Sequence, residues 1–179
     1  KKRIVTSIFL FFLLILMFNY SFLLIIFTII IAIISWVEFY ALISKIFKKN
    51  SLIEKTKRIF AKVFSLIYFS IVAFILITNF ELKNYIFFTL LISIFSDIGG
   101  LFVGRIFKGK KLTKISPNKT IAGSVGSFLF ALIPLIFIPL IDEIYNNVHL
   151  AQLVIVSLLL SLICQAGDLL ISYFKRKAK

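Results

Sequence analysis

The sequence predicts an all-α fold, a polytopic membrane bundle of about six transmembrane helices. Of the 179 residues, 61% are hydrophobic, whereas an average soluble domain is about 45–50% apolar. The mean hydropathy is +1.09, and apolar runs long enough to cross a bilayer recur along the chain. These runs do not alternate between apolar and polar residues, as the strands of a membrane barrel would. We therefore expect helices within a single integral membrane domain, residues 1–179.

The first apolar stretch, residues 4–43, is expected to contain two spans. As one helix it would be about 60 Å long, roughly twice the thickness of the hydrocarbon core. Polar residues interrupt it at 19–21, so the chain is expected to turn back there. The expected spans are about 4–18, 22–44, 63–78, 84–107, 120–141 and 148–174. The first three form the N-terminal part, and the later three carry the candidate site.

The basic residues agree with this topology. The formal net charge is +14, and with six spans every Lys and Arg except Lys83 falls on one side of the membrane. By the positive-inside rule this side is cytoplasmic, and both ends of this chain face it. Residues 51–54 resemble a capping box that starts a basic interfacial helix ahead of the span at 63–78. No nucleic-acid-binding module is recognisable, so nucleic acid is not an expected partner.

Three acidic residues lie inside the expected spans. Glu38, Asp97 and Asp168 each precede a basic boundary residue by seven or eight positions, so each lies roughly 10 to 12 Å inside the membrane boundary. An ionisable group there costs about 2.5 kcal/mol or more and usually faces a bundle interior or a wet cavity. Glu38 lies in the aromatic segment WVEFY, where an interfacial position is the simpler interpretation. Small neighbours leave room for a ligand beside Asp97 and Asp168.

The segment ISPNKT, residues 115–120, is predicted to begin the fifth span as a phosphate-binding helix start. Ser116 is a favoured N-cap and Pro117 a favoured first helical residue. Free N–H groups and the positive end of the helix dipole are then expected beside Lys119 and Thr120. A helix start alone does not require this lysine and threonine, so their presence favours an anionic ligand.

Small residues recur every four positions in the fourth span, at Ser96, Gly100 and Gly104. This pattern favours close helix packing, and it is also compatible with the lining of a cavity. Carboxylates at a membrane boundary can hold a divalent cation, basic side chains neutralise phosphate, and apolar spans accommodate acyl chains. The implied substrates are a polyphosphate and a phospholipid.

Three motifs together resemble the bacterial phosphatidate cytidylyltransferase (CDP-diacylglycerol synthase) family. They are DIGG with GRIFKGKKL, then KISPNKTIAGSVGS, then AGDLLISYFKR, and the resemblance covers essentially the whole chain. It implies transfer of a cytidylyl group from CTP to phosphatidate, which gives CDP-diacylglycerol and pyrophosphate with Mg²⁺. It also implies a place in the bacterial inner membrane, and a homodimer is a further expectation.

The resemblance and the charge pattern together assign the expected site residues. Asp97 and Asp168 are the expected metal ligands, and with Lys119 they are the expected catalytic residues. The expected substrate-binding residues are Ser116, Pro117, Asn118, Lys119, Thr120, Lys175, Arg176, Gly100 and Gly104.

Two departures from the family pattern accompany the resemblance. Ile171 stands where the family usually has Glu, and the family's C-terminal signature would begin after Lys179. We therefore expect the chain to be part of a longer protein, and this piece to be inactive alone.

Three other functions stay open on the sequence alone. An ion-coupled transporter would use Asp97 and Asp168 as coupling residues. A purely structural bundle would need only the packing of small residues. A related cytidylyltransferase would act on a different lipid phosphate.

Overall fold

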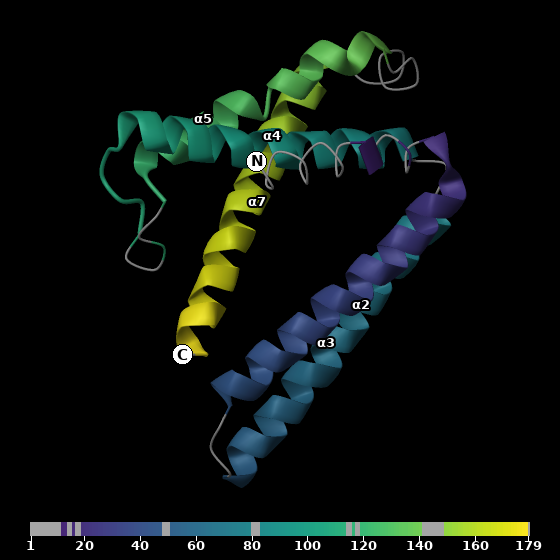
Figure 1. Cartoon of the computed structure of the whole chain (residues 1–179), viewed down its shortest axis with the longest axis vertical. Helices are drawn as coiled ribbons and strands as arrows, with labels where there is room; N and C mark the ends of the chain where they lie inside the picture. Colours follow the sequence, from purple (N-terminus) through teal and green to yellow (C-terminus); the bar gives the residue numbers. More distant parts are fainter. Residues whose placement is uncertain are drawn as a thin grey trace. The chain divides into compact units, whose positions relative to one another are not determined.

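The computed structural model describes residues 12, 13, 16, 19–47, 51–79, 83–113, 116, 119–140 and 149–178, and the long elements within them are all helical (Figure 1). In chain order these are α2 (Ser21–Ile46), α3 (Leu52–Thr78), α4 (Lys83–Phe107), α5 (Ile121–Phe130), the 3₁₀-helix η2 (Ile133–Leu140) and α7 (Leu150–Lys177). Five stretches of the described chain are long and apolar enough to cross a membrane. The all-α membrane fold is thus confirmed. Most of the first expected span, 4–18, lies outside the described residues.

The first of two compact units comprises the described part of residues 1–83. In it α2 and α3 run antiparallel and side by side (Figure 1). The rings of Phe39 and Phe69 meet edge to face, with centroids 6.2 Å apart. The ammonium group of Lys62 lies 3.5 Å from the centroid of the Tyr40 ring, a cation–π contact. Aromatic contacts therefore join the two helices in the second half of α2.

The start of α3 confirms one prediction and corrects another. The Ser51 hydroxyl accepts a hydrogen bond from the backbone N–H of Glu54 at 3.3 Å, so the helix begins where the capping box predicted. The helix then continues without a break to Thr78, so the expected interfacial helix and the span at 63–78 are one element. At 1.5 Å per residue it is about 40 Å long. That exceeds a hydrocarbon core of about 30 Å, so its basic first turns can extend beyond the apolar layer.

The second unit, the described part of residues 84–177, contains α4, α5, η2 and α7. Buried residues recur at helical spacing, since one face of each long helix packs inward. On α4 these are Phe88, Ile92, Ser96 and Gly99. On α7 they are Leu153, Ser157 and Ser161. The apolar core draws on α4, η2 and α7 and on the turn after α5: Phe88, Ile92, Ala131, Ile138 and Leu153.

Glycines allow α4 and α5 to approach closely. A Cβ on Gly126 would lie 2.5 Å from the Cβ of Val103 and 2.7 Å from the carbonyl oxygen of Gly99. A Cβ on Gly123 would lie 2.7 Å from the carbonyl oxygen of Gly100. These separations are too short for any side chain, so only glycine fits. The helix-packing interpretation of the small-residue repeat on α4 is thus confirmed.

The fifth expected span is present, but it is not one continuous α-helix. The segment Ile121–Ile138 is apolar enough to cross a membrane, yet α5 occupies only its first ten residues and η2 follows. Pro134 and Pro139 lie in η2. A proline has no N–H to donate and its ring clashes with the preceding turn of an α-helix. Pro134, four residues after Phe130, therefore prevents α5 from continuing.

Replacing Gly126 with valine should destabilise the second unit, because the added atoms would overlap Val103 and the Gly99 carbonyl. We expect the melting temperature of the purified complete protein to fall by about 5 °C or more. Gly167→Ala is the matched control, since no described atom lies within 4 Å of a Cβ at that position. An equal response of both variants in a thermal melt would contradict the close packing of α4 and α5.

Candidate functional site

A pocket in the second unit is lined by α4, the loop after it, the first turns of α5, and α7. Its volume is about 200 Å³, smaller than the roughly 300–1,000 Å³ of typical small-molecule sites. The charged and other polar side chains that line it are Asp97, Lys119, Thr120, Ser124, Gln165 and Asp168, with Ser127 deeper along α5. A space of this size and polarity suits a phosphate group better than an entire nucleotide.

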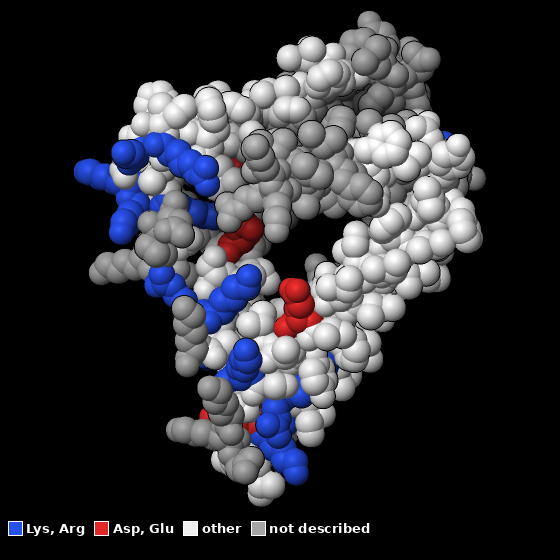
Figure 2. Space-filling model, in the orientation of Figure 1, with Lys and Arg blue, Asp and Glu red and all other residues white. Residues whose placement is uncertain are grey.

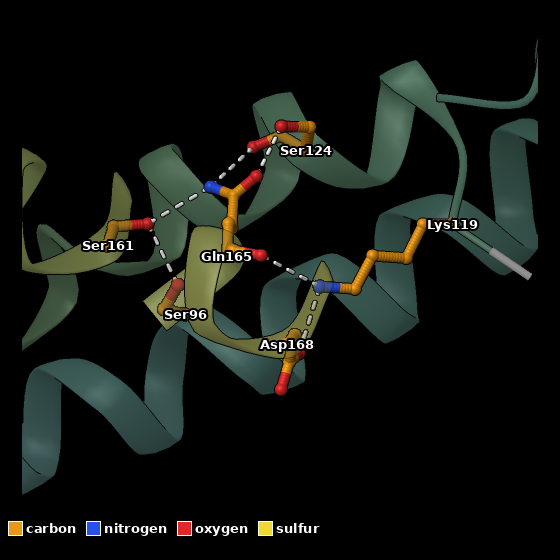
Figure 3. A network of polar contacts seen from close by, with 6 residues as sticks. All are labelled: Ser96, Lys119, Ser124, Ser161, Gln165 and Asp168. Carbon is orange, nitrogen blue, oxygen red and sulfur yellow. Dashed lines mark hydrogen bonds and ion pairs between the residues drawn. The ribbon is translucent and has the colours of Figure 1, made fainter. Parts of the chain in front are cut away.

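Lys119 and Asp168 form an ion pair at this pocket. The Lys119 Nζ lies 2.9 Å from Asp168 Oδ2, and it also donates to the main-chain oxygen of Gln165 at 3.4 Å (Figure 3). The Asp168 side chain is 56% exposed and the Lys119 side chain 27% exposed. The carboxylate thus remains accessible from the pocket while the ammonium group is largely enclosed.

The two acids expected at one depth do meet in one pocket. Asp97 lines it from α4 and Asp168 lines it from α7. The described residues hold no cluster of three or more His, Cys, Asp or Glu side chains. Mg²⁺ commonly uses one or two carboxylates together with substrate phosphates, so this pair fits that ion. Glu38 is exposed on α2 in the first unit and does not line the pocket.

The start of α5 differs from the prediction. Thr120 is the N-cap, because its hydroxyl accepts a hydrogen bond from the backbone N–H of Gly123 at 3.0 Å. The assignment of Ser116 as the N-cap is therefore wrong. The backbone N–H of Ile121 donates to the carbonyl oxygen of Lys110 at 3.0 Å, where the loop folds back antiparallel. With these N–H groups occupied, an anion at this helix start would depend chiefly on the Lys119 cation.

The loop after α4 is strongly basic. Arg105 lies in the last turn of α4, and Lys108, Lys110 and Lys111 follow on the exposed surface. Figure 2 shows Lys and Arg side chains gathered over this part of the visible face. Lys108 has a φ of 45°, in the left-handed region, where the chain leaves the helix. The loop thus carries exposed positive charge, and its Leu112 lines the pocket.

Three more of the expected residues support the pocket. Gly100 lines it directly. A Cβ on Gly104 would lie 3.1 Å from the Thr120 hydroxyl, so this glycine leaves room for the helix cap. Ser116 is buried, and its carbonyl oxygen accepts a hydrogen bond from the Lys119 backbone N–H at 3.1 Å. Ser116 thus holds the backbone that presents Lys119, although its side chain does not line the cavity.

The remaining expected residues are not part of the cavity wall described. Lys175 and Arg176 lie in the last turn of α7 and are exposed. Lys175 follows Asp168 by seven residues, about 10 Å along the helix. Pro117 and Asn118 lie outside the described residues.

Gln165 was not among the expected site residues, yet it lines the pocket one turn before Asp168. Its side chain bonds to Ser124 on α5 and to Ser161 on its own helix. The available signal was a carboxamide in the middle of an apolar span, because polar side chains within the membrane commonly join helices.

Together these features define an integral membrane protein with a pocket lined by two carboxylates and one lysine. The chain belongs to the cytidylyltransferase family, whose model matches residues 1–179.

Curated relatives with the name phosphatidate cytidylyltransferase support this membership. The chain is 40% identical to that of Staphylococcus saprophyticus over 101 residues, which is 55% of this chain and 38% of the relative. It is 41% identical to that of Rickettsia typhi over 86 residues, 45% of this chain and 38% of the relative. The matched region thus spans well under half of these relatives' length. No solved structure matches the chain significantly.

The corrected helix start can be tested by substitutions at Thr120. Thr120→Val removes the hydroxyl that caps α5 and should lower the free energy of unfolding by about 1 kcal/mol, whereas Thr120→Ser should retain most of it. Ser116→Ala keeps the backbone bonds of that residue and should change stability much less. Chemical denaturation of the three variants in detergent checks this order. A larger loss for Ser116→Ala than for Thr120→Val would restore the original assignment.

Proposed function

We propose that the complete protein is a phosphatidate cytidylyltransferase, which transfers a cytidylyl group from CTP to phosphatidate. The products are CDP-diacylglycerol and pyrophosphate, made during phospholipid synthesis. One observation carries the proposal: Asp97, Lys119 and Asp168, far apart in sequence, line one pocket in a chain of the cytidylyltransferase family. The proposal also draws on the names of the relatives.

The chemistry requires the approach of two anions. An oxygen of the phosphatidate phosphate attacks the α-phosphorus of CTP and forms a P–O bond. The bond between the α-phosphorus and the oxygen bridging to the β-phosphate breaks, and pyrophosphate leaves. Because both reactants are negative, catalysis depends on neutralising charge and aligning the two groups. No covalent intermediate with the protein is needed.

Different pocket residues would neutralise the phosphate charge and align the reactants. Lys119 would neutralise phosphate oxygens, because its cation lies at the cavity beside the first turn of α5. Asp97 and Asp168 would hold Mg²⁺, which when bound would neutralise phosphate charge and orient the triphosphate. Lys119 now neutralises Asp168. With Mg²⁺ held by the two carboxylates, the Lys119 cation would be available to phosphate oxygens.

The distribution of lysines and arginines along the chain supports the proposed orientation in the membrane. We place the basic loops and both ends of this chain on the cytoplasmic side of a bacterial inner membrane, where CTP is available. The polar headgroup of phosphatidate would then meet the nucleotide at the membrane boundary. A homodimer stays a prediction.

The activity can be tested with the complete protein in lipid vesicles, CTP labelled at the α-phosphate, phosphatidate and Mg²⁺. We expect label to enter the lipid extract. Asp168→Asn and Lys119→Gln should each lower kcat/KM by about 10²–10³-fold, since each removes one charge from the phosphate site. Lys57→Gln, which removes an exposed cation of α3, should remain within about threefold of the unchanged protein.

The control reactions decide among the alternatives. Labelled lipid that forms without phosphatidate, from another lipid phosphate, would correct the acceptor. A folded complete protein that transfers no label to any lipid would refute the proposal.

A further inference from the structure

Gln165 links α7 to α5 through every polar atom of its side chain. Its Oε1 accepts a hydrogen bond from the Ser124 hydroxyl. Its Nε2 donates to the carbonyl oxygen of Ser124 at 3.5 Å and to the hydroxyl of Ser161 at 3.3 Å. Figure 3 shows the carboxamide between these two serines. The side chain is thus held from both sides, and its rotation is restricted.

The same network continues to α4. The hydroxyl oxygens of Ser161 and Ser96 lie 2.8 Å apart, and both residues are completely buried. Ser96 directly precedes Asp97, which lines the pocket. One series of hydrogen bonds therefore joins α5, α7 and α4, the three helices that carry or adjoin the charged groups.

Gln165 also adjoins both members of the ion pair. Asp168 follows it by three residues on α7, so the two side chains lie on neighbouring parts of one helix face. The main-chain oxygen of Gln165 accepts a hydrogen bond from Lys119. Ser124 lies in the first turns of α5, directly after the segment that presents Lys119. Fixing Ser124 against Gln165 therefore fixes where Lys119 and Asp168 meet.

Hydrogen bonds matter more here than at the α4–α5 contact. Glycines determine the approach of α4 and α5, whereas Gly167 of α7 has no described atom within 4 Å of a Cβ position. In a membrane, apolar side chains do little to fix the position of one helix along another, because the lipid tails are equally apolar. The described polar contacts of α5 with α7 centre on Gln165.

We propose that Gln165 is a positioning residue for the transfer reaction: it sets the register of α5 against α7, and thereby the geometry of Lys119 relative to Asp168. This inference rests on the proposed cytidylyl transfer for its kinetic consequence only. The placement of the two charged residues is a separate, structural consequence. A residue that merely stabilised the bundle would change the melting temperature and leave the turnover of folded molecules unchanged.

The placement is tested by cross-linking, which requires no activity. Lys119→Cys and Asp168→Cys are combined in the complete protein with Cys164→Ala and with its other cysteines replaced by alanine, and a short bifunctional thiol reagent is added. Adding Gln165→Leu should slow cross-linking about tenfold, because the two sites lose their fixed separation. Ser157→Ala is the matched control and should change the rate less than about twofold. Ser157 is a buried serine of α7 whose hydroxyl donates to Leu153 of the same helix.

The kinetic arm uses the enzyme with its native Lys119 and Asp168. Gln165→Leu should lower kcat by about 10–100-fold while KM for CTP changes less than about threefold, since a displacement near 1 Å can cost 10²-fold in rate. The main-chain oxygen that accepts from Lys119 is retained in this variant. Ser124→Ala, which removes one donor to Gln165, should give a smaller loss and serves if Gln165→Leu does not fold.

The outcomes separate this inference from the proposed function. Folded Gln165→Leu and Ser124→Ala variants that cross-link and turn over at the unchanged rates would overturn the positioning role. If the unchanged protein transfers no label, the proposed function fails, and the cross-linking rates alone then decide whether Gln165 positions the pair.

Discussion

The close approach of α4 and α5 at their glycines determines how Asp97 and Lys119 of the pocket lie relative to each other. Asp97 precedes the first of these contacts, at Gly99, by two residues, and Lys119 precedes Gly123 on the facing helix by four. The contact that joins the helices therefore also sets the separation of a carboxylate and a cation. In lipid such backbone packing is a main source of helix association, because apolar side chains are already solvated by the bilayer. The glycines that pack α4 against α5 and these two charged residues of the pocket therefore lie in the same short stretches of the chain.

Hydropathy and charge predicted much of this molecule. The expected membrane helices beyond residue 20 are present. Asp97 and Asp168, singled out in the sequence as acids with small neighbours, line one pocket, whereas Glu38 at the same expected depth does not. The N-cap was misplaced because Ser116–Pro117 and Thr120 are both acceptable local helix starts. The antiparallel return of the loop to Lys111 favours Thr120. That contact is tertiary, so a local pattern does not contain it.

Hydrophobic periodicity in the sequence does not predict two other features of the site. The bonds of Gln165 to Ser124 and Ser161 depend on how α7 is rotated against α5, and an apolar span gives almost no signal of rotation. Lys175 and Arg176 were expected to bind nucleotide or lipid phosphate because they follow Asp168 in the motif, and that role stays a prediction. Since α7 continues straight, it carries them about two turns past the cavity wall.

The change from α5 to η2 affects how the chain crosses the membrane. An α-helix rises about 1.5 Å per residue and a 3₁₀-helix about 2 Å, so residues 121–140 together extend about 33 Å. An uninterrupted α-helix would need about two more residues for that length. Pro134 thus confines the glycine-rich, closely packed half of the span to the side that holds the pocket. The more extended half completes the crossing with fewer residues.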